Sequence, residues 1–284
     1  MASTVTLPKQ RRFGETTRSD AWWIQPILVF LGFSAFIVYS TWAAFQGIDS
    51  THCYYWYGGE PGPTYHPNYL SPFYSPELFG SVPHPGLFGV IPSWWPAFLP
   101  FSPALLIMWI PAGFRFTCYY YRGAYYKAFW LDPVNCAVGE PRKTYLGERY
   151  FPLIIQNIHR YFFYLAVWFI FILSWDAWDG LWFTDDLSGT QHFGVGVGSL
   201  VLIMNVFLLA SYTFGCHSLR HLIGGFLDSK SKAPVCAKGY SCVSCLNSHH
   251  MFWAWLSLFW VGFADLYIRL CAMGIWQDFR IFIL

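Results

Sequence analysis

The sequence predicts an all-α integral membrane protein: a bundle of five transmembrane helices with a cytoplasmic N-terminus and an external C-terminus. Aromatic residues make up 22% of the chain and charged residues 11%, which is the composition of a lipid-embedded protein. Five apolar runs approach the ~20 residues that a helix needs to cross a ~30 Å hydrocarbon core. These runs are residues 22–46, 97–113, 152–175, 193–215 and 250–273.

The distribution of basic residues gives the orientation. Of the 17 Lys and Arg residues, four precede the first run, seven lie from Arg115 to Arg160, and four lie between the fourth and fifth runs. Only Arg269 and Arg280 fall elsewhere. Because short basic loops stay cytoplasmic, the inner loops are predicted at 114–151 and 216–249. The outer loops are then 47–96 and 176–192, and residues 1–284 form a single membrane domain.

Each run has local signals of its own. Trp22 and Trp23 mark a membrane interface ahead of the first run, which is too long for a cleavable signal peptide. Pro103 and Pro111 predict kinks in the second run. Pro152 suits the first turn of the third helix. The Gly-rich stretch 194–198 opens the fourth helix, where small residues permit close contact.

Cysteine and histidine gather on the predicted inner side, which holds six of eight cysteines and five of nine histidines. Cytoplasmic thiols are normally reduced, so a disulfide framework is not expected there. Thiolate and imidazole at the ends of several helices are typical metal ligands. Any one of these residues is better explained as a small apolar Cys or an interfacial His. Together they favour a redox or metal site.

Two short motifs stand out in this inventory. Cys216-His-Ser-Leu-Arg-His221 closes the fourth helix, and its two histidines share one helix face. The alternative is a basic cap for the helix dipole, which does not need Cys216. Cys242-Val-Ser-Cys245 has the spacing of half a zinc or cluster site, or of unliganded thiols.

The histidine positions argue against a di-haem bundle, because the first two runs contain no histidine. A single inner haem held by His159 and a histidine of the fourth or fifth helix stays open. A Rieske [2Fe–2S] centre uses two cysteines and two histidines. The soluble Rieske motif is absent, so its ligands would come from separate helices.

Asp265 and Arg269 lie one turn apart within the fifth run. Ionisable residues inside a membrane are costly and suggest function by default. Proton movement and an internal ion pair that locks the helix remain equal alternatives.

Several stretches resemble the five-helix membrane anchor subunit of a succinate dehydrogenase/fumarate reductase class found in actinobacteria and other bacteria. They are Tyr69–Pro76, Phe114–Lys127, Gln156–Tyr164, Cys216–His221, and His250-Met251 with Ala264–Tyr267. The resemblance implies a cytoplasmic flavoprotein subunit that oxidises succinate, an iron–sulfur subunit, and electron delivery to a menaquinone-type acceptor. Some members of this class lack haem and hold a Rieske-type cluster in the membrane subunit. No role carries over to the Cys236–Cys245 loop.

Helix connectivity then suggests the cluster ligands. His221 ends the fourth helix and His250 starts the fifth, so the connecting loop brings them together on the inner side. With Cys118 and Cys216 they form the first-choice set, with the reserve His217, His249, Cys136, Cys242 and Cys245. The quinone candidates are His159, Arg160 and Tyr161, with Tyr119 or Trp130 as walls.

Two other functions stay open at this point: a haem b quinone-reducing anchor, and a transporter or structural membrane protein without a redox role. Lipids are expected partners, a higher oligomer stays open, and nothing in the sequence indicates nucleic acid. The quinone and the direction of electron flow are not encoded in any motif.

Overall fold

The computed structural model describes residues 12–46, 53–58, 65–80, 86–96, 98, 101–141, 149–151, 153–226, 229 and 233–284. Contacts divide the chain into two compact units. The first unit comprises Met1–Ala35 and Phe116–Ile158, and the second comprises Phe36–Arg115 and His159–Leu284.

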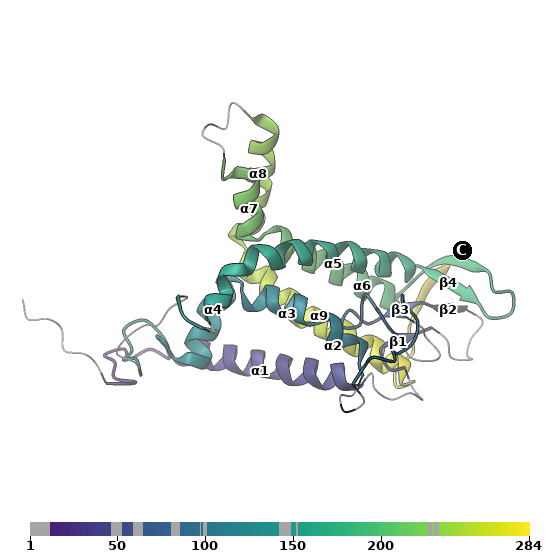
Figure 1. The fold of residues 1–284 in the computed structure, drawn as a ribbon, viewed down its shortest axis with the longest axis horizontal. Coiled ribbons are helices and arrows are strands. Elements are labelled where there is room, and N and C mark those ends of the chain that lie inside the picture. Colours follow the sequence, from purple (N-terminus) through teal and green to yellow (C-terminus); the bar gives the residue numbers. More distant parts are fainter. Residues whose placement is uncertain are drawn as a thin grey trace, which may run out of the picture. The chain divides into compact units, whose positions relative to one another are not determined.

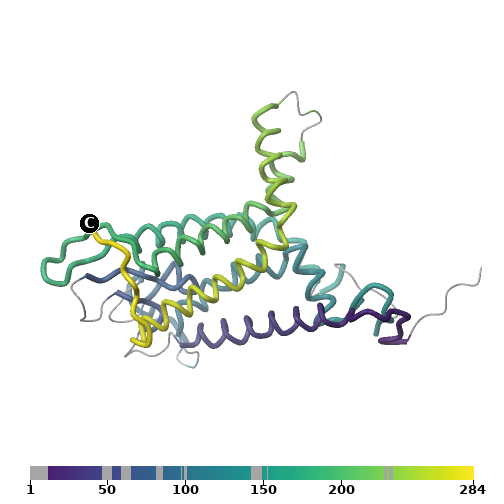
Figure 2. Tube along the Cα trace, turned by 180° about the vertical axis from the view of Figure 1, so that it is seen from behind, coloured from purple at the N-terminus to yellow at the C-terminus, as the bar shows by residue number. Residues whose placement is uncertain are grey.

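A helical bundle forms the centre of the second unit. Helices α5 (His159–Asp179), α6 (Val197–Phe214) and α9 (His250–Ala272) lie side by side, with α6 packed against both others (Figures 1 and 2). Each of these segments is long and apolar enough to cross a membrane, as is α1 (Ile24–Phe45). The described residues therefore contain four helices of spanning length, where the sequence predicted five.

The missing fifth is the second apolar run, which breaks into short pieces. Helix α2 covers Pro103–Ile107 and α3 covers Trp109–Phe116. Each proline lies in a first turn, where its missing N–H costs no helical hydrogen bond. The two predicted kinks thus become two helix starts.

The prediction of a strictly all-α fold is wrong, because strands form beyond the C-terminal end of α5 (Figure 1). A four-stranded antiparallel sheet has the order β2 (Tyr65–Pro67), β4 (Trp182–Asp185), β5 (Gln191–Gly196), β6 (Arg280–Ile283). Strands β1 (Trp56–Tyr57) and β3 (Tyr69–Leu70) form a separate pair. Strand β5 takes residues 193–196 from the predicted fourth helix. Glycine is a poor helix former, and pairing with two strands satisfies its backbone groups.

The Gly-rich stretch makes a close contact, but with Tyr69 rather than with another helix. The Tyr69 hydroxyl lies 3.0 Å from both Ser199 Oγ and Asp278 Oδ2. A Cβ on Gly198 would lie 2.3 Å from the Tyr69 ring. Burial and the nearby Asp278 carboxylate raise the pKa of Tyr69, so its hydroxyl stays a donor at physiological pH.

Gly198→Ala is therefore expected to destabilise the second unit by about 1–3 kcal/mol, the usual cost of overpacking a core. The thermal unfolding midpoint of the purified complex measures this. Gly262→Ala is the matched control, because its Cβ would meet Phe36 at an ordinary 3.6 Å within α9. Equal midpoints for both variants would show that the Tyr69 contact yields without cost.

The predicted inner loop 216–249 contains two helices. Helices α7 (His217–Gly224) and α8 (Pro234–Ser248) pack on each other and project from the bundle as an arm (Figure 1). Gly224 permits this packing, since a Cβ there would lie 2.1 Å from the Tyr240 ring. The Arg220 guanidinium lies over the same ring, 5.1 Å from its centroid.

The first unit contains the start of α1, helix α4 (Tyr119–Tyr125), the π-helical turn η2 (Tyr126–Trp130) and the 3₁₀ turn η4 (Leu153–Ile158). Gln156 links η4 to η2: it is 1% exposed, and its side chain accepts a hydrogen bond from the Tyr126 hydroxyl at 2.7 Å. Near the start of α1, Arg18 donates to Asn135 Oδ1 and to the Cys136 carbonyl at 3.2 and 3.0 Å.

Candidate functional site

Cys216 lies at the junction of α6 and α7, where it caps the N-terminus of α7. Its Sγ accepts a hydrogen bond from the Ser218 N–H at 3.4 Å, and the residue is buried. The preceding residue, Gly215, has no side chain, so the junction between α8 and α9 can lie close to it: an added Cβ would lie 3.3 Å from His250 Nδ1. Asn247 fixes this junction by donating to the Gly215 carbonyl at 2.8 Å. The thiol is thus held in the interior rather than in the arm.

His159 is the imidazole in direct contact with this thiol. It is the first residue of α5, and its Nε2 lies 3.1 Å from Cys216 Sγ. Its ring stacks on Phe114 with the centroids 4.8 Å apart and the planes 5° from parallel. The stacking fixes the orientation of the ring, so the contact with Cys216 is a built feature of the packing.

His250, the first residue of α9, supplies a second buried imidazole, with 2% of its surface exposed. Its ring stacks on Tyr212 at 4.9 Å, and Tyr212 meets Phe114 at 5.4 Å. His159, Phe114, Tyr212 and His250 therefore form a continuous series of rings across α5, α3, α6 and α9.

Arg115 adds a fixed positive charge to this cluster. Its guanidinium donates to the Ala254 carbonyl at 3.1 Å and to Ser257 Oγ at 3.0 Å. It also lies over the Tyr212 ring, 4.8 Å from the centroid. Sequence reasoning counted Arg115 only as a topological signal, although its place in the Phe114–Lys127 stretch could have marked it.

The first-choice ligands fall into different environments. Cys216 and His250 are buried in the second unit, whereas His221 is exposed on α7, with Nδ1 3.4 Å from Arg160 Nη2. Cys118 is 1% exposed and caps α4 in the first unit. His159, placed among the quinone candidates, thus has the thiol contact that His221 lacks.

The reserve ligands are on the surface. Those on the arm and its junction are exposed: His217, His249, Cys242 and Cys245. Cys136 is exposed in the first unit. Cys242 and Cys245 are both exposed on α8, one helical turn apart.

The quinone candidates are divided between the two units. His159, Arg160 and Tyr161 start α5, and the Tyr161 side chain is 69% exposed. Tyr119 belongs to the first unit and is likewise exposed. Trp130 is half-buried there, packed on Tyr125 at 5.8 Å.

The donor types partly fit an iron–sulfur cluster. The second unit supplies one buried thiol and two imidazoles, but no three His, Cys, Asp or Glu side chains among the described residues converge as a metal ion requires.

A haem held by His159 and His250 fits less well. Phe114 and Tyr212 link the two imidazoles through ring contacts, so a macrocycle ligated by both would have to displace these two aromatic rings.

Comparison with known proteins identifies the chain. The family profile described as actinobacterial succinate dehydrogenase subunit SdhC matches residues 24–274. The chain belongs to this SdhC family. A chain of the Mycobacterium smegmatis Sdh1 complex in the apo form is 42% identical to it, with a TM-score of 0.80. The match covers 99% of this chain and 100% of that chain. No curated protein matches.

Membership confirms the predicted resemblance and sets the role of the chain. An SdhC-family chain is a membrane anchor subunit of an oxidoreductase and does not itself oxidise succinate. With several helices of spanning length, it is a multi-pass protein of the bacterial cytoplasmic membrane. A transporter without a redox role is thereby set aside.

Proposed function

We propose that this SdhC-family chain docks a flavoprotein subunit and an iron–sulfur subunit and delivers electrons from them to a membrane quinone. The proposed site of delivery is the group of side chains formed by Cys216, His159 and His250. The observation that carries the proposal is the 3.1 Å contact between Cys216 Sγ and His159 Nε2 beside the buried His250. Thiol and imidazole side chains at the helix ends, as ligands of a redox centre, would suit delivery of electrons from a soluble partner on the same side of the membrane.

A Rieske-type [2Fe–2S] cluster is the cofactor that best suits these donors, and when bound it would supply one-electron transfer. We propose Cys118, Cys216 and His250 as three of its ligands. For the second imidazole, His159 is favoured over His221, because His159 already contacts Cys216 whereas His221 lies exposed beside Arg160.

Arg115 would assist quinone reduction through its charge. A guanidinium held by Ala254, Ser257 and Tyr212 keeps its position when an electron arrives nearby. A preorganised positive charge stabilises developing negative charge without a reorganisation cost. Arg160 and Tyr161 at the start of α5 could then bind the quinone oxygens, with Tyr119 and Trp130 as the proposed walls.

The topology is tested by labelling with a membrane-impermeant maleimide. Ser188→Cys places a thiol at the exposed tip between β4 and β5, on the predicted outer side. It is expected to label in intact cells. The exposed native Cys236, Cys242 and Cys245 on α8 are expected to label only after permeabilisation. The reverse pattern would invert the orientation and the docking side.

The function is tested by comparing the two imidazoles. His159→Ala and His250→Ala are each expected to abolish quinone reduction, while reduction of a soluble artificial acceptor by succinate continues. His221→Ala is the matched control and is expected to keep both activities. Loss of quinone reduction in His221→Ala and His250→Ala, with normal reduction in His159→Ala, would restore the ligand set chosen from the sequence.

A further inference from the structure

One loop of the second unit, residues 86–96, presents large hydrophobic side chains on its surface and is called the apolar loop below. Leu87, Phe88 and Trp94 are 73%, 70% and 67% exposed. The sequence predicted this stretch to be part of the outer loop 47–96, in contact with water. Exposed apolar surfaces of this kind mark a contact with a membrane or with another protein.

Backbone hydrogen bonds hold the first residues of the apolar loop in a defined turn. The Leu87 N–H donates to the Glu77 carbonyl at 2.8 Å. The Phe88 N–H donates to the Leu78 carbonyl at 2.8 Å. Gly89 follows with a φ of 90°, a conformation that favours glycine. The turn therefore fixes the positions from which the Leu87 and Phe88 side chains project outside the core.

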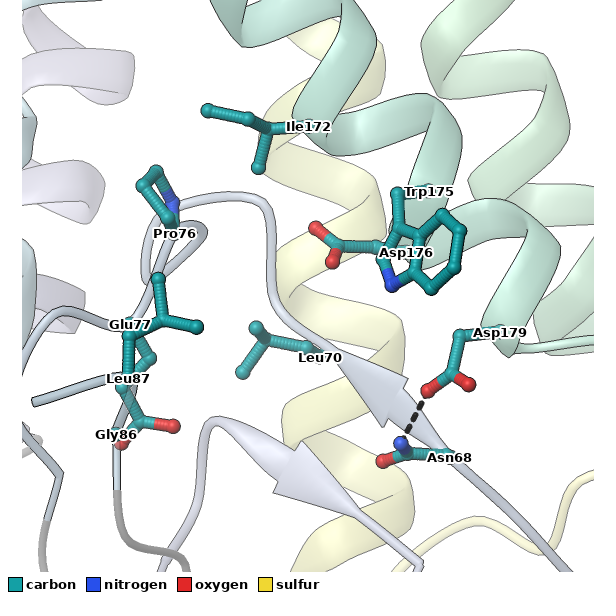
Figure 3. Close-up of a pocket in the computed structure, with 10 residues that line it drawn as sticks. All are labelled: Asn68, Leu70, Pro76, Glu77, Gly86, Leu87, Ile172, Trp175, Asp176 and Asp179. Carbon is teal, nitrogen blue, oxygen red and sulfur yellow. Dashed lines mark hydrogen bonds between the residues drawn. The ribbon is translucent and has the colours of Figure 1, made fainter. Parts of the chain in front are cut away.

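The apolar loop lies beside the C-terminal end of the spanning helix α5. Leu87 lines a pocket together with Ile172 and Trp175 of that helix (Figure 3). Trp175 is exposed on the surface of α5, as is Trp178 in the last turn. Tryptophan is enriched where a spanning helix meets the membrane surface. Leu87 therefore lies at the depth at which α5 leaves the hydrocarbon core.

A second spanning helix, α1, places the other end of the apolar loop at a similar depth. Ser102 follows shortly after the loop, and its Oγ donates a hydrogen bond to the carbonyl of Ala44, next to the last residue of α1. Ring contacts connect the loop to this point. Trp94 meets Trp95 with the centroids 6.0 Å apart, and Trp95 meets Phe101 at 5.1 Å. Both ends of the loop are thus tied to the ends of spanning helices.

We propose that the apolar loop is inserted into the lipid leaflet at this end of the bundle, with its side chains among the acyl chains just below the head groups. Between Glu77 and Arg115 the sequence contains no Asp, Glu, Lys or Arg. A protein interface surrounds its apolar centre with a polar rim, whereas a membrane interface combines aliphatic side chains with tryptophan. The composition of the loop therefore favours lipid over a second protein. Without a side-chain charge, the loop contacts acyl chains and selects no head group.

The accessibility of a nitroxide probe, measured by EPR on the complex in lipid nanodiscs, tests the proposal. Ser93→Cys attaches the probe at an exposed position of the apolar loop, in a background whose exposed native cysteines are replaced by serine. Molecular oxygen, which concentrates in lipid, is expected to relax this nitroxide more strongly than a water-soluble nickel chelate does. Ser188→Cys, at the exposed tip between β4 and β5, is the matched control. At that position the nickel chelate is expected to have the larger effect.

The double variant Leu87→Asn/Phe88→Asn keeps the backbone hydrogen bonds of the turn and removes its apolar side chains. The nitroxide at position 93 is then expected to become accessible to the nickel chelate, because an amide without partners is costly in hydrocarbon. Leu187→Asn, which changes an exposed leucine between β4 and β5, is expected to leave that nitroxide unchanged.

Two results for the probe at position 93, with Leu87 and Phe88 intact, would overturn the proposal. A larger effect of the nickel chelate than of oxygen would place the apolar loop in water. Exclusion of both reagents would assign the loop to an interface with another protein chain, either a second copy or a partner subunit.

Discussion

Arg269→Met is expected to cost about 3–5 kcal/mol of folding stability, the usual effect of removing one partner from a buried ion pair. Asp265 is fully buried and Arg269 is 1% exposed. The Arg269 guanidinium donates to both Asp265 oxygens at 3.2 Å and to the Ala43 carbonyl at 3.3 Å. The Tyr39 hydroxyl donates to Asp265 at 2.6 Å, and Ser71 donates to the other oxygen. The pair thus joins α9 to α1 and to the segment after β3.

The double variant Asp265→Asn/Arg269→Met is expected to recover most of this loss, because it leaves no uncompensated charge. The thermal unfolding midpoints of the two single variants and the double variant form a double-mutant cycle that measures the coupling. Quinone reduction per assembled complex is expected to be normal in the double variant. Wild-type stability with lost quinone reduction would instead support the proton-transfer alternative, which the sequence left open.

Cys216→Ser is expected to lower quinone reduction at least about a hundredfold, since loss of a metal ligand exceeds the 10–100-fold effect of changing a residue that only hydrogen-bonds to a ligand. Succinate-dependent reduction of a soluble artificial acceptor should continue, because that chemistry belongs to the partner subunits. Cys245→Ser removes an exposed thiol on α8 and serves as the matched control. Equal quinone reduction in the two variants would remove Cys216 from the proposed site.

Much of the bundle could be predicted from the sequence, because apolar length and helix dimensions are tightly linked in a membrane. The fifth apolar run and α9 differ by a single residue, 250–273 against His250–Ala272. Residues 193–196 were misassigned because an apolar Gly-rich stretch has no strand alternation and its partners, β4 and β6, are remote in sequence. The arm of α7 and α8 was not predicted, because neither helix is long and apolar enough to be recognised from the sequence.

The candidate site was predictable in composition but not in geometry. Counting cysteines and histidines directed attention to one end of the bundle, and Cys216 and His250 are buried there. The choice of His221 failed to anticipate that Gly215 and Cys216 end α6 and start a new helix, which carries His221 to the surface. The contact between His159 and Cys216 could not be predicted, because it joins residues 57 positions apart.

Iron and acid-labile sulfide content, with low-temperature EPR, tests the central claim most directly. It compares the purified wild-type complex with the Cys118→Ser and Cys216→Ser complexes. The wild type is predicted to contain two more iron and two more sulfide atoms per complex than either variant, and to show a Rieske-type signal that both variants lack. Identical iron content and spectra in all three complexes, with normal quinone reduction, would contradict the claim that this chain holds the final cluster.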